Sequence, residues 1–401
     1  MEKTKNRWAV LVAAIVINMS LGAGYAWSVF QSALLEVNSD WALSQTSLAF
    51  SISFAMVPIA MIICGPIIDK QGGKKVVLLS GLLFGIGMFA TGFVTSIPML
   101  YLTYGLILGL GIGAGYGTAT SLTVKWFPDK KGLAGGLTAA GFGSGAIILA
   151  PIATNMINSF GIYNTFKILG IVLLVVVCVA SFWMEKAPVS STSNAAVQVN
   201  ENDKNYKQML REPNFWLLWV VYTFAATSGM MIIGHAASLA DYYSLGTGTV
   251  IVMIVGLSNT LGRIIWGAIS DRLGRYITVL LMFIFSAAGL LLLNFNESIG
   301  TFAGILGLIL IPSSFGGFLG SFPGITAENW GASKAAANYG WMFTAYGIAS
   351  IMGPSLASQI REASGSYSMA FIIAMVMAVI GIILILWYMA QKKKAEVGEK
   401  A

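Results

Sequence analysis

The sequence predicts an all-α membrane protein with twelve transmembrane helices. Of its 401 residues, 57% are hydrophobic and only 10% are charged, whereas soluble domains carry about 25% charged residues. The apolar residues gather into twelve stretches, and most are long enough for a helix to cross a bilayer core, which takes about 20 residues. A charged loop sequence also occurs twice, half a chain apart. This duplication indicates two related halves.

The twelve apolar stretches define the expected spans to within a few residues. They are 8–30, 44–68, 75–95, 98–124, 132–157, 163–184, 213–240, 247–270, 275–294, 299–327, 334–360 and 366–390. Within the tenth, we expect residues 311–320 to form an irregular helix. Residues 185–212 are polar and lack a long apolar run, which is typical of a linker. The sequence therefore predicts an N-terminal six-helix bundle (1–184), a linker (185–212) and a C-terminal six-helix bundle (213–401).

The basic residues predict which helix ends face the cytoplasm. With the N-terminus inside, all of the 23 Lys and Arg residues fall on the inside except Lys167, Arg263 and Arg361. The outside loops hold acidic residues, namely Glu36, Asp40, Asp241, Glu297 and Glu362. We therefore expect a multi-pass protein of the plasma or inner cell membrane, with both termini and the linker in the cytoplasm. The basic residues form no patch on a soluble domain, so no nucleic-acid partner is expected.

Arg263 is the deepest basic residue in the sequence. It precedes the charged turn at 271–275 by about 12 Å of helix, which places it near the middle of a hydrocarbon core about 30 Å thick. A charge there costs at least about 2.5 kcal/mol and by default indicates a functional site. Asn259 lies one turn earlier on the same face, where its amide can orient the guanidinium but cannot neutralise it.

No Asp or Glu is expected at the depth of Arg263, so its counter-charge would come from water or a bound anion. The alternative is an arginine satisfied by backbone carbonyls in a broken helix. A carboxylate suits the anion because it can accept two parallel hydrogen bonds from a guanidinium.

Polar and aromatic residues of other spans complete the predicted site. Buried tyrosines need hydrogen-bond partners for their hydroxyl groups, and phenylalanines can surround a small apolar body. The only histidine, His235, lies in the outer half of its span, where a proton relay, a gate and a packing role all remain open. The predicted substrate-binding residues are Arg263, Tyr25, Tyr116, Tyr346, Asn259, Phe315, Phe343 and His235.

The duplicated loops, at 65–75 and 267–275, share one pattern. Each has Gly, three residues, Asp, a basic residue, one residue, Gly and a basic residue, and the first copy has one extra glycine, Gly73. This pattern resembles the loop signature of the major facilitator superfamily. The resemblance implies two six-helix bundles around a central cavity that opens alternately to either side. It also implies a gating role for Asp69, Lys70, Gly73, Asp271, Arg272 and Arg275.

Three stretches narrow the resemblance: Tyr-Ala-Trp-Ser-Val-Phe at 25–30, Asn-Thr-Leu-Gly-Arg at 259–263, and Asn-Tyr-Gly-Trp-Met-Phe-Thr-Ala-Tyr at 338–346. Together they resemble the oxalate/formate antiporter family, a group near the monocarboxylate porters. The resemblance implies that Arg263 contacts the substrate carboxylate. Two positions differ from these families. The oxalate exchanger has a lysine where this chain has Tyr346, and animal-type porters have an aspartate where this chain has Asn259.

We therefore expect a secondary transporter that moves a small monocarboxylate of the lactate, pyruvate or formate class by uniport, exchange or symport. The alternatives are an oxalate-type dicarboxylate/monocarboxylate exchanger and a non-transporting carboxylate sensor. The expected partners are a small carboxylate anion and the lipid bilayer, with a proton or a counter-anion as a coupled species. We expect a monomer without a cofactor or a metal. An enzyme is not expected, because one histidine and no deep acid supply little catalytic chemistry.

Overall fold

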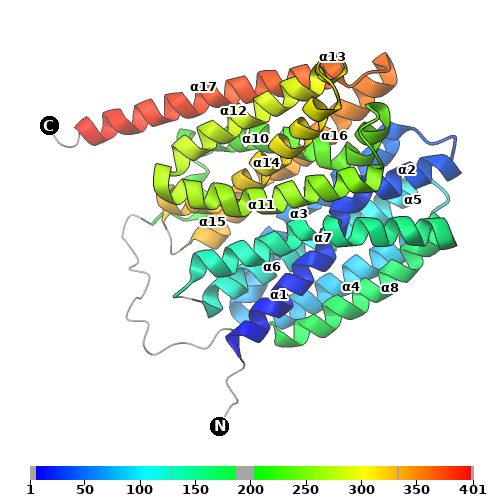
Figure 1. The fold of residues 1–401 in the computed structure, drawn as a ribbon. Helices are drawn as coiled ribbons and strands as arrows, with labels where there is room; N and C mark the ends of the chain where they lie inside the picture. The colour runs from blue at the N-terminus through cyan, green and yellow to red at the C-terminus, as the bar shows by residue number, and fades with distance from the viewer. Residues whose placement is uncertain (1–5, 128, 187–202, 332–333, 399–401) are drawn as a thin grey trace, which may run out of the picture.

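The computed structural model describes residues 6–127, 129–186, 203–331 and 334–398, apart from the side chains at 69–70, 131–132, 335–336 and 395–398. The described chain is built of helices that run side by side along one long direction (Figure 1). The first helix, which begins at Arg7, starts at the same side of the molecule at which the last helix, which ends at Gly398, finishes (Figure 1). We call this side the terminal end and the opposite side the far end.

The N-terminal half of the chain supplies the first six spans. Their helices are α1 (Arg7–Leu21), the 3₁₀ turn η1 (Gly22–Ala26), α2 (Trp27–Val37), α3 (Leu43–Gln71), α4 (Lys74–Thr91), α5 (Ile97–Leu100), the π-helix η2 (Tyr101–Leu108), α6 (Gly109–Trp126), α7 (Lys131–Phe160), α8 (Ile162–Ala180) and η3 (Ser181–Trp183). Gly113 lets α6 lie directly on α3, because a Cβ atom there would collide with the backbone oxygen of Val57.

The C-terminal half supplies the other six spans. Its helices are α9 (Tyr206–Met209), α10 (Pro213–Tyr242), α11 (Gly248–Leu273), α12 (Arg275–Asn294), α13 (Asn296–Ile299), α14 (Thr301–Trp330), α15 (Ala335–Met342), α16 (Thr344–Ser364) and α17 (Ser368–Gly398). Within the described residues, 11 helical stretches are long and apolar enough to cross a membrane. The remaining expected span is the pair α15 and α16, which is interrupted at Phe343.

The expected irregularity of residues 311–320 is wrong. Helix α14 runs through them without a break, with Pro312 and Pro323 inside it. Membrane helices tolerate proline where neighbouring groups satisfy the freed backbone. The helix breaks lie instead at η1 in the first span and at Phe343 in the eleventh.

Most of the expected linker, residues 187–202, lies outside the described residues. Its last part packs on the C-terminal half. Lys204 pairs with Glu212 at 2.6 Å, Asn338 Nδ2 donates to the backbone oxygen of Lys204, and Tyr206 stacks on Trp341 with ring centroids 5.7 Å apart. This part of the chain is therefore held beside α15.

The two halves meet mainly where α7 lies antiparallel to α11 and where α3 lies antiparallel to α15 and α16, with a smaller contact between α2 and α10. In Figure 1, α7 and α11 lie side by side. At the far end, Thr154 and Thr249 share a hydrogen bond of 2.7 Å, and the Ser44 backbone N–H donates to Glu362 at 2.7 Å. At the terminal end, Cβ atoms added at Gly136 or Gly267 would meet nothing within 4 Å. Along α7 and α11, the halves therefore touch at the far end and separate toward the terminal end.

Candidate functional site

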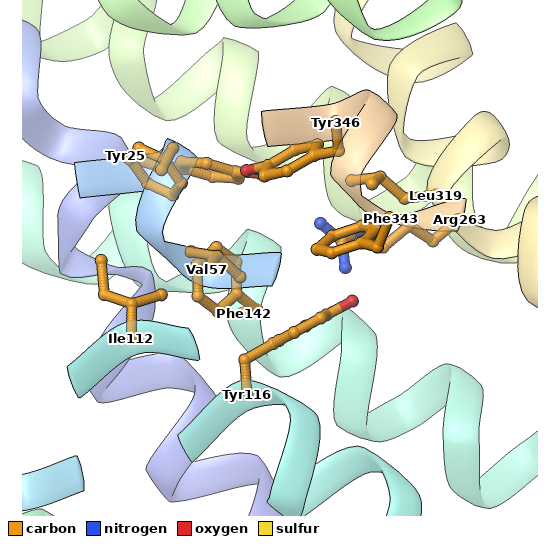
Figure 2. Close-up of a pocket in the computed structure, with 10 residues that line it drawn as sticks. Tyr25, Val57, Ile112, Tyr116, Phe142, Arg263, Leu319, Phe343 and Tyr346 are labelled. Carbon is orange, nitrogen blue, oxygen red and sulfur yellow. The ribbon is translucent and has the colours of Figure 1, made fainter. Parts of the chain in front are cut away.

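A small cavity lies between the two halves (Figure 2), and its lining residues fall mostly near the middle of their spans. Its volume is about 10 Å³, which is room for about one water molecule. Its walls come from η1, α3, α6 and α7 on one side and from α11, α14 and the α15–α16 break on the other. They are Tyr25, Phe54, Val57, Ile112, Tyr116, Phe142, Arg263, Leu319, Phe343 and Tyr346. Five of the eight predicted binding residues are therefore wall residues.

Arg263 is the only charged side chain among these wall residues. It is 6% exposed. Its Nε donates to Asn259 Oδ1 at 3.2 Å, and one terminal nitrogen donates to the backbone oxygen of Ala139, in the opposite half, at 2.8 Å. Among the described residues, no carboxylate lies within 4.0 Å of its nitrogens. The guanidinium nitrogens face the cavity beside Phe343 and Tyr116 (Figure 2).

The alternative to a bound anion was an Arg263 whose hydrogen bonds are satisfied by backbone carbonyls. The Ala139 carbonyl supplies one such bond. However, a guanidinium has five N–H donors, and the two bonds to Asn259 and Ala139 both go to neutral acceptors. The positive charge is thus solvated by dipoles, not balanced by an acid, and a bound anion would supply the missing negative charge.

Asn259 is held in one orientation. It is fully buried, and its Nδ2 donates to the backbone oxygen of Pro312 in α14 at 3.4 Å. Its Oδ1 is therefore the atom that accepts from Arg263. The amide orients the guanidinium without adding charge, as the one-turn spacing predicts.

Two helix breaks bring tyrosines and a phenylalanine to the cavity. Gly22, at the start of η1, lies against α7, since a Cβ atom there would collide with the backbone oxygen of Phe142. Tyr25 follows in η1, and its hydroxyl lies 3.3 Å from that of Tyr346 in α16. Phe343, at the second break, stacks on Tyr346 with centroids 4.5 Å apart. Interrupted helices of this kind are typical of transporter substrate sites.

Tyr116 approaches from the other direction. Its ring lies parallel to that of Phe343 across the two halves, at 6.3 Å, and its hydroxyl points to the Arg263 side of the cavity (Figure 2). Phe315 does not line the cavity. It is 1% exposed and stacks behind Tyr346 at 6.2 Å, so it supports a wall residue in this conformation.

His235 lies away from the cavity, between α10 and α3. Its Nδ1 lies 3.2 Å from the backbone oxygen of Met231, which can only accept, so Nδ1 carries the proton. Its Nε2 then accepts from the hydroxyl of Ser47, at 3.1 Å, across the two halves. This position suits the gate and packing alternatives for His235, and its role stays a prediction.

The comparisons with known proteins agree with this architecture. A family model described as "Major Facilitator Superfamily" matches residues 15–354 and 244–401. The chain belongs to the Major Facilitator Superfamily. Within it, the chain is 30% identical over 382 residues to the oxalate:formate antiporter of Oxalobacter formigenes, covering 94% of this chain and 90% of that protein. It is also 30% identical over 354 residues to YhjX, an uncharacterized MFS-type transporter of Escherichia coli (strain K12), with 86% of each chain covered.

Weaker similarities extend over most of this chain. Human monocarboxylate transporter 10 is 24% identical over 416 residues, covering 98% of this chain and 80% of that protein. A crystal structure of a point mutant of the nucleoside transporter NupG superposes with a TM-score of 0.71 at 13% identity, over 95% of this chain and 99% of that one, which supports the fold alone. The chain is therefore a secondary transporter of the superfamily, near the oxalate/formate antiporter family.

The loop residues of this transporter occupy matching turns. Gly72 and Gly274 follow the second and eighth spans with φ of +81° and +84°, a conformation that favours glycine. Gly73 packs on Thr118 and Leu122, and Arg275 lies 3.6 Å from Glu328. Asp271 and Arg272 are exposed, whereas the side chains of Asp69 and Lys70 lie outside the described ones. The gating role of these residues stays a prediction.

Five wall residues were not predicted from the sequence: Phe54, Val57, Ile112, Phe142 and Leu319. Each is an apolar residue in an apolar helix, so nothing in the sequence distinguishes it from a lipid-facing or core residue. Arg263 and the three tyrosines were predictable because charged and hydroxyl groups are rare at this depth, and Phe343 because it lies one turn before Tyr346 on the same face.

Proposed function

We propose that this transporter carries a small monocarboxylate, of the lactate, pyruvate or formate class, with its carboxylate on Arg263. The observation that carries the proposal is a single buried guanidinium, solvated by neutral acceptors, beside a cavity with aromatic and aliphatic walls. A carboxylate can accept two parallel hydrogen bonds from a guanidinium. One negative charge then balances one positive charge.

The count of charges favours a monoanion. A dianion would leave the cavity with one unbalanced negative charge, which costs several kcal/mol in a low-dielectric site. The relatives named for oxalate, formate and monocarboxylates support the anion class. The rival proposal is an oxalate-type dicarboxylate/monocarboxylate exchanger, in which the hydroxyls of Tyr25, Tyr116 and Tyr346 would bind the second carboxylate.

We further propose that the protein lies in the plasma or inner cell membrane as a monomer, with its terminal end in the cytoplasm, and that it acts without enzymatic activity. A proton or a counter-anion remains the candidate for a coupled species. Membrane-impermeant thiol reagents test the orientation. A cysteine at exposed Gln71 should react only from the inside, and one at exposed Asp40 only from the outside. Outside labelling at Gln71 would reverse the assignment.

The test of function is uptake of a panel of radiolabelled carboxylates into proteoliposomes, with and without a pH gradient and an internal counter-substrate. We expect saturable uptake of monocarboxylates. Arg263→Gln should abolish it because the charge is lost, and Arg263→Lys should reduce it strongly because the two-pronged geometry is lost. Near-normal uptake by Arg263→Gln would contradict the site.

A further inference from the structure

The cavity has two unlike sides. Arg263 belongs to the C-terminal half. The N-terminal half supplies six wall residues. Tyr25 and Tyr116 carry hydroxyl groups, and the other four carry only hydrocarbon: Phe54 and Val57 from α3, Ile112 from α6 and Phe142 from α7. Each is at most 4% exposed. We call these four residues the apolar lobe. In Figure 2, Ile112 and Val57 lie across the cavity from Arg263.

The apolar lobe is closely built. A Cβ atom on Gly24 would come within 3.0 Å of the Phe54 ring tip and 3.2 Å of Ile112 Cδ1, so both side chains converge beneath η1. The ring of Phe142 stands edge-on to Tyr25 at 4.9 Å and to Tyr116 at 5.1 Å. The Tyr25 hydroxyl is bonded to Tyr346, and the Tyr116 hydroxyl points to the Arg263 side of the cavity (Figure 2), so neither belongs to the lobe.

This arrangement limits what a bound anion carries at its other end. With its carboxylate on Arg263, the rest of the molecule must enter the apolar lobe. A second charge or a polar group there would lose its hydration without gaining a partner, whereas a hydrocarbon tail would be buried favourably. We propose that Val57 and Ile112 set the length of the hydrocarbon tail that the transporter accepts. The proposal rests on the proposed function and narrows its substrate class to short monocarboxylates with an apolar tail.

Val57 and Ile112 differ from the two phenylalanines in what else they hold. Phe54 packs on Phe50 at 4.7 Å and on Tyr25 at 5.1 Å, and Phe142 packs on two tyrosines, so truncating either ring would displace polar wall residues. Val57 and Ile112 have no ring, so no ring contact with a tyrosine depends on either side chain. Both are β-branched and therefore stiff. We therefore expect that shortening either side chain enlarges the lobe while the rings and Arg263 keep their places.

Because the cavity is small, a difference of one carbon in the substrate tail should change the affinity. The cavity volume of about 10 Å³ means that the halves can close around a tail only if the lobe has room for it. One buried methylene group is worth about 0.8 kcal/mol, or about a fourfold change in affinity at 1.4 kcal/mol per factor of ten. Val57→Ala and Ile112→Val should each favour the next longer acid over the shorter one by about fourfold.

The experiment is competition in proteoliposomes at neutral pH. Uptake of radiolabelled lactate is measured in the presence of unlabelled formate, acetate, propionate, butyrate or valerate. For each pair of acids that differ by one carbon, the ratio of their half-inhibitory concentrations is compared among variants. The matched control is Val77→Ala, the same change at a fully buried position of α4 that does not line the cavity. It should leave the ratios unchanged, and Val57→Leu should shift them toward shorter acids.

The outcomes separate the two proposals. If lactate uptake depends on Arg263 but the ratios of Val57→Ala and Ile112→Val match those of Val77→Ala, the lobe does not set tail length. If the wild type transports no monocarboxylate, or Arg263→Gln transports normally, the proposed function fails and this inference fails with it. Should Val57→Ala not fold, Ile112→Val removes only one methyl group and carries the test.

Discussion

At the scale of single residues, the charge of Arg263 is held by an amide and a carbonyl in place of an acid. The substitution Asn259→Asp replaces the amide with an acid of nearly the same shape. A carboxylate 3.2 Å from the Nε of Arg263 would neutralise the guanidinium from within the protein, and a bound monoanion would then leave the cavity with a net negative charge. We expect the apparent KM for monocarboxylate uptake at pH 7 to rise by about tenfold or more, since each factor of ten needs only 1.4 kcal/mol.

The control for this change is Asn259→Ser, which removes the orienting contact but keeps the position neutral. It should weaken uptake less than Asn259→Asp does. An unchanged KM in Asn259→Asp would show that the net charge of the cavity does not govern binding.

Tyr346→Lys makes the opposite change, because it adds a second positive charge to the cavity wall. In the wild type, we expect oxalate to compete roughly 10²-fold less well than lactate or formate, given the cost of an unbalanced charge. Tyr346→Lys should narrow this gap by about tenfold, as measured by inhibition of labelled uptake. Tyr346→Phe loses the same contact with Tyr25 without adding charge, and should leave the gap unchanged. Equal competition by oxalate in the wild type would favour the exchanger alternative.

At the scale of helices, the contact of α7 with α11 positions the arginine. A Cβ atom on Gly143 would lie 2.6 Å from Thr260 Oγ1 and 2.9 Å from Asn259 Oδ1. Gly143→Ala should therefore push α11 away at the residue that orients Arg263, and we expect transport to fall about tenfold or more with the protein still folded. Gly135→Ala on the same helix meets a single atom, a Val124 methyl at 3.3 Å, and should be tolerated. Equal rates in both variants would argue against a close α7–α11 contact during transport.

Helix positions were predictable from the sequence to a large extent, and helix breaks were not. A span follows from apolar length alone, so the all-α fold and the twelve-helix pattern could be predicted. An interruption of a helix depends on the other helices that pack against it. One break begins at Gly22, which lies against the Phe142 carbonyl of another helix, whereas Pro312 lies inside an unbroken helix. The same distinction applies to the site, where Arg263 was predictable from its charge and Phe142 was not.

At the scale of the whole molecule, α7 and α11 follow one antiparallel register from the far end inward. Thr154 pairs with Thr249, Gly143 lies against Thr260, and the Ala139 carbonyl accepts from Arg263. About two helical turns beyond the Gly143 contact, the same register brings Gly136 opposite Gly267, and neither has an atom within 4 Å of its Cβ position. The register thus continues across a gap at the terminal end.

This gap predicts how the molecule closes on that side. If the halves rock about the cavity, the far-end contacts open while Gly136 meets Gly267, because glycines allow two helices to approach closely.

In a background with Cys64 and Cys178 replaced by serine, the pair Thr154→Cys and Thr249→Cys should cross-link readily in the conformation described here. The pair Gly136→Cys and Gly267→Cys should cross-link only when the terminal end closes, and faster during turnover with substrate. Either cross-link should stop uptake, and reduction should restore it. If the glycine-position pair never cross-links while uptake proceeds, the halves do not close along this register, and the terminal end must seal through other helices.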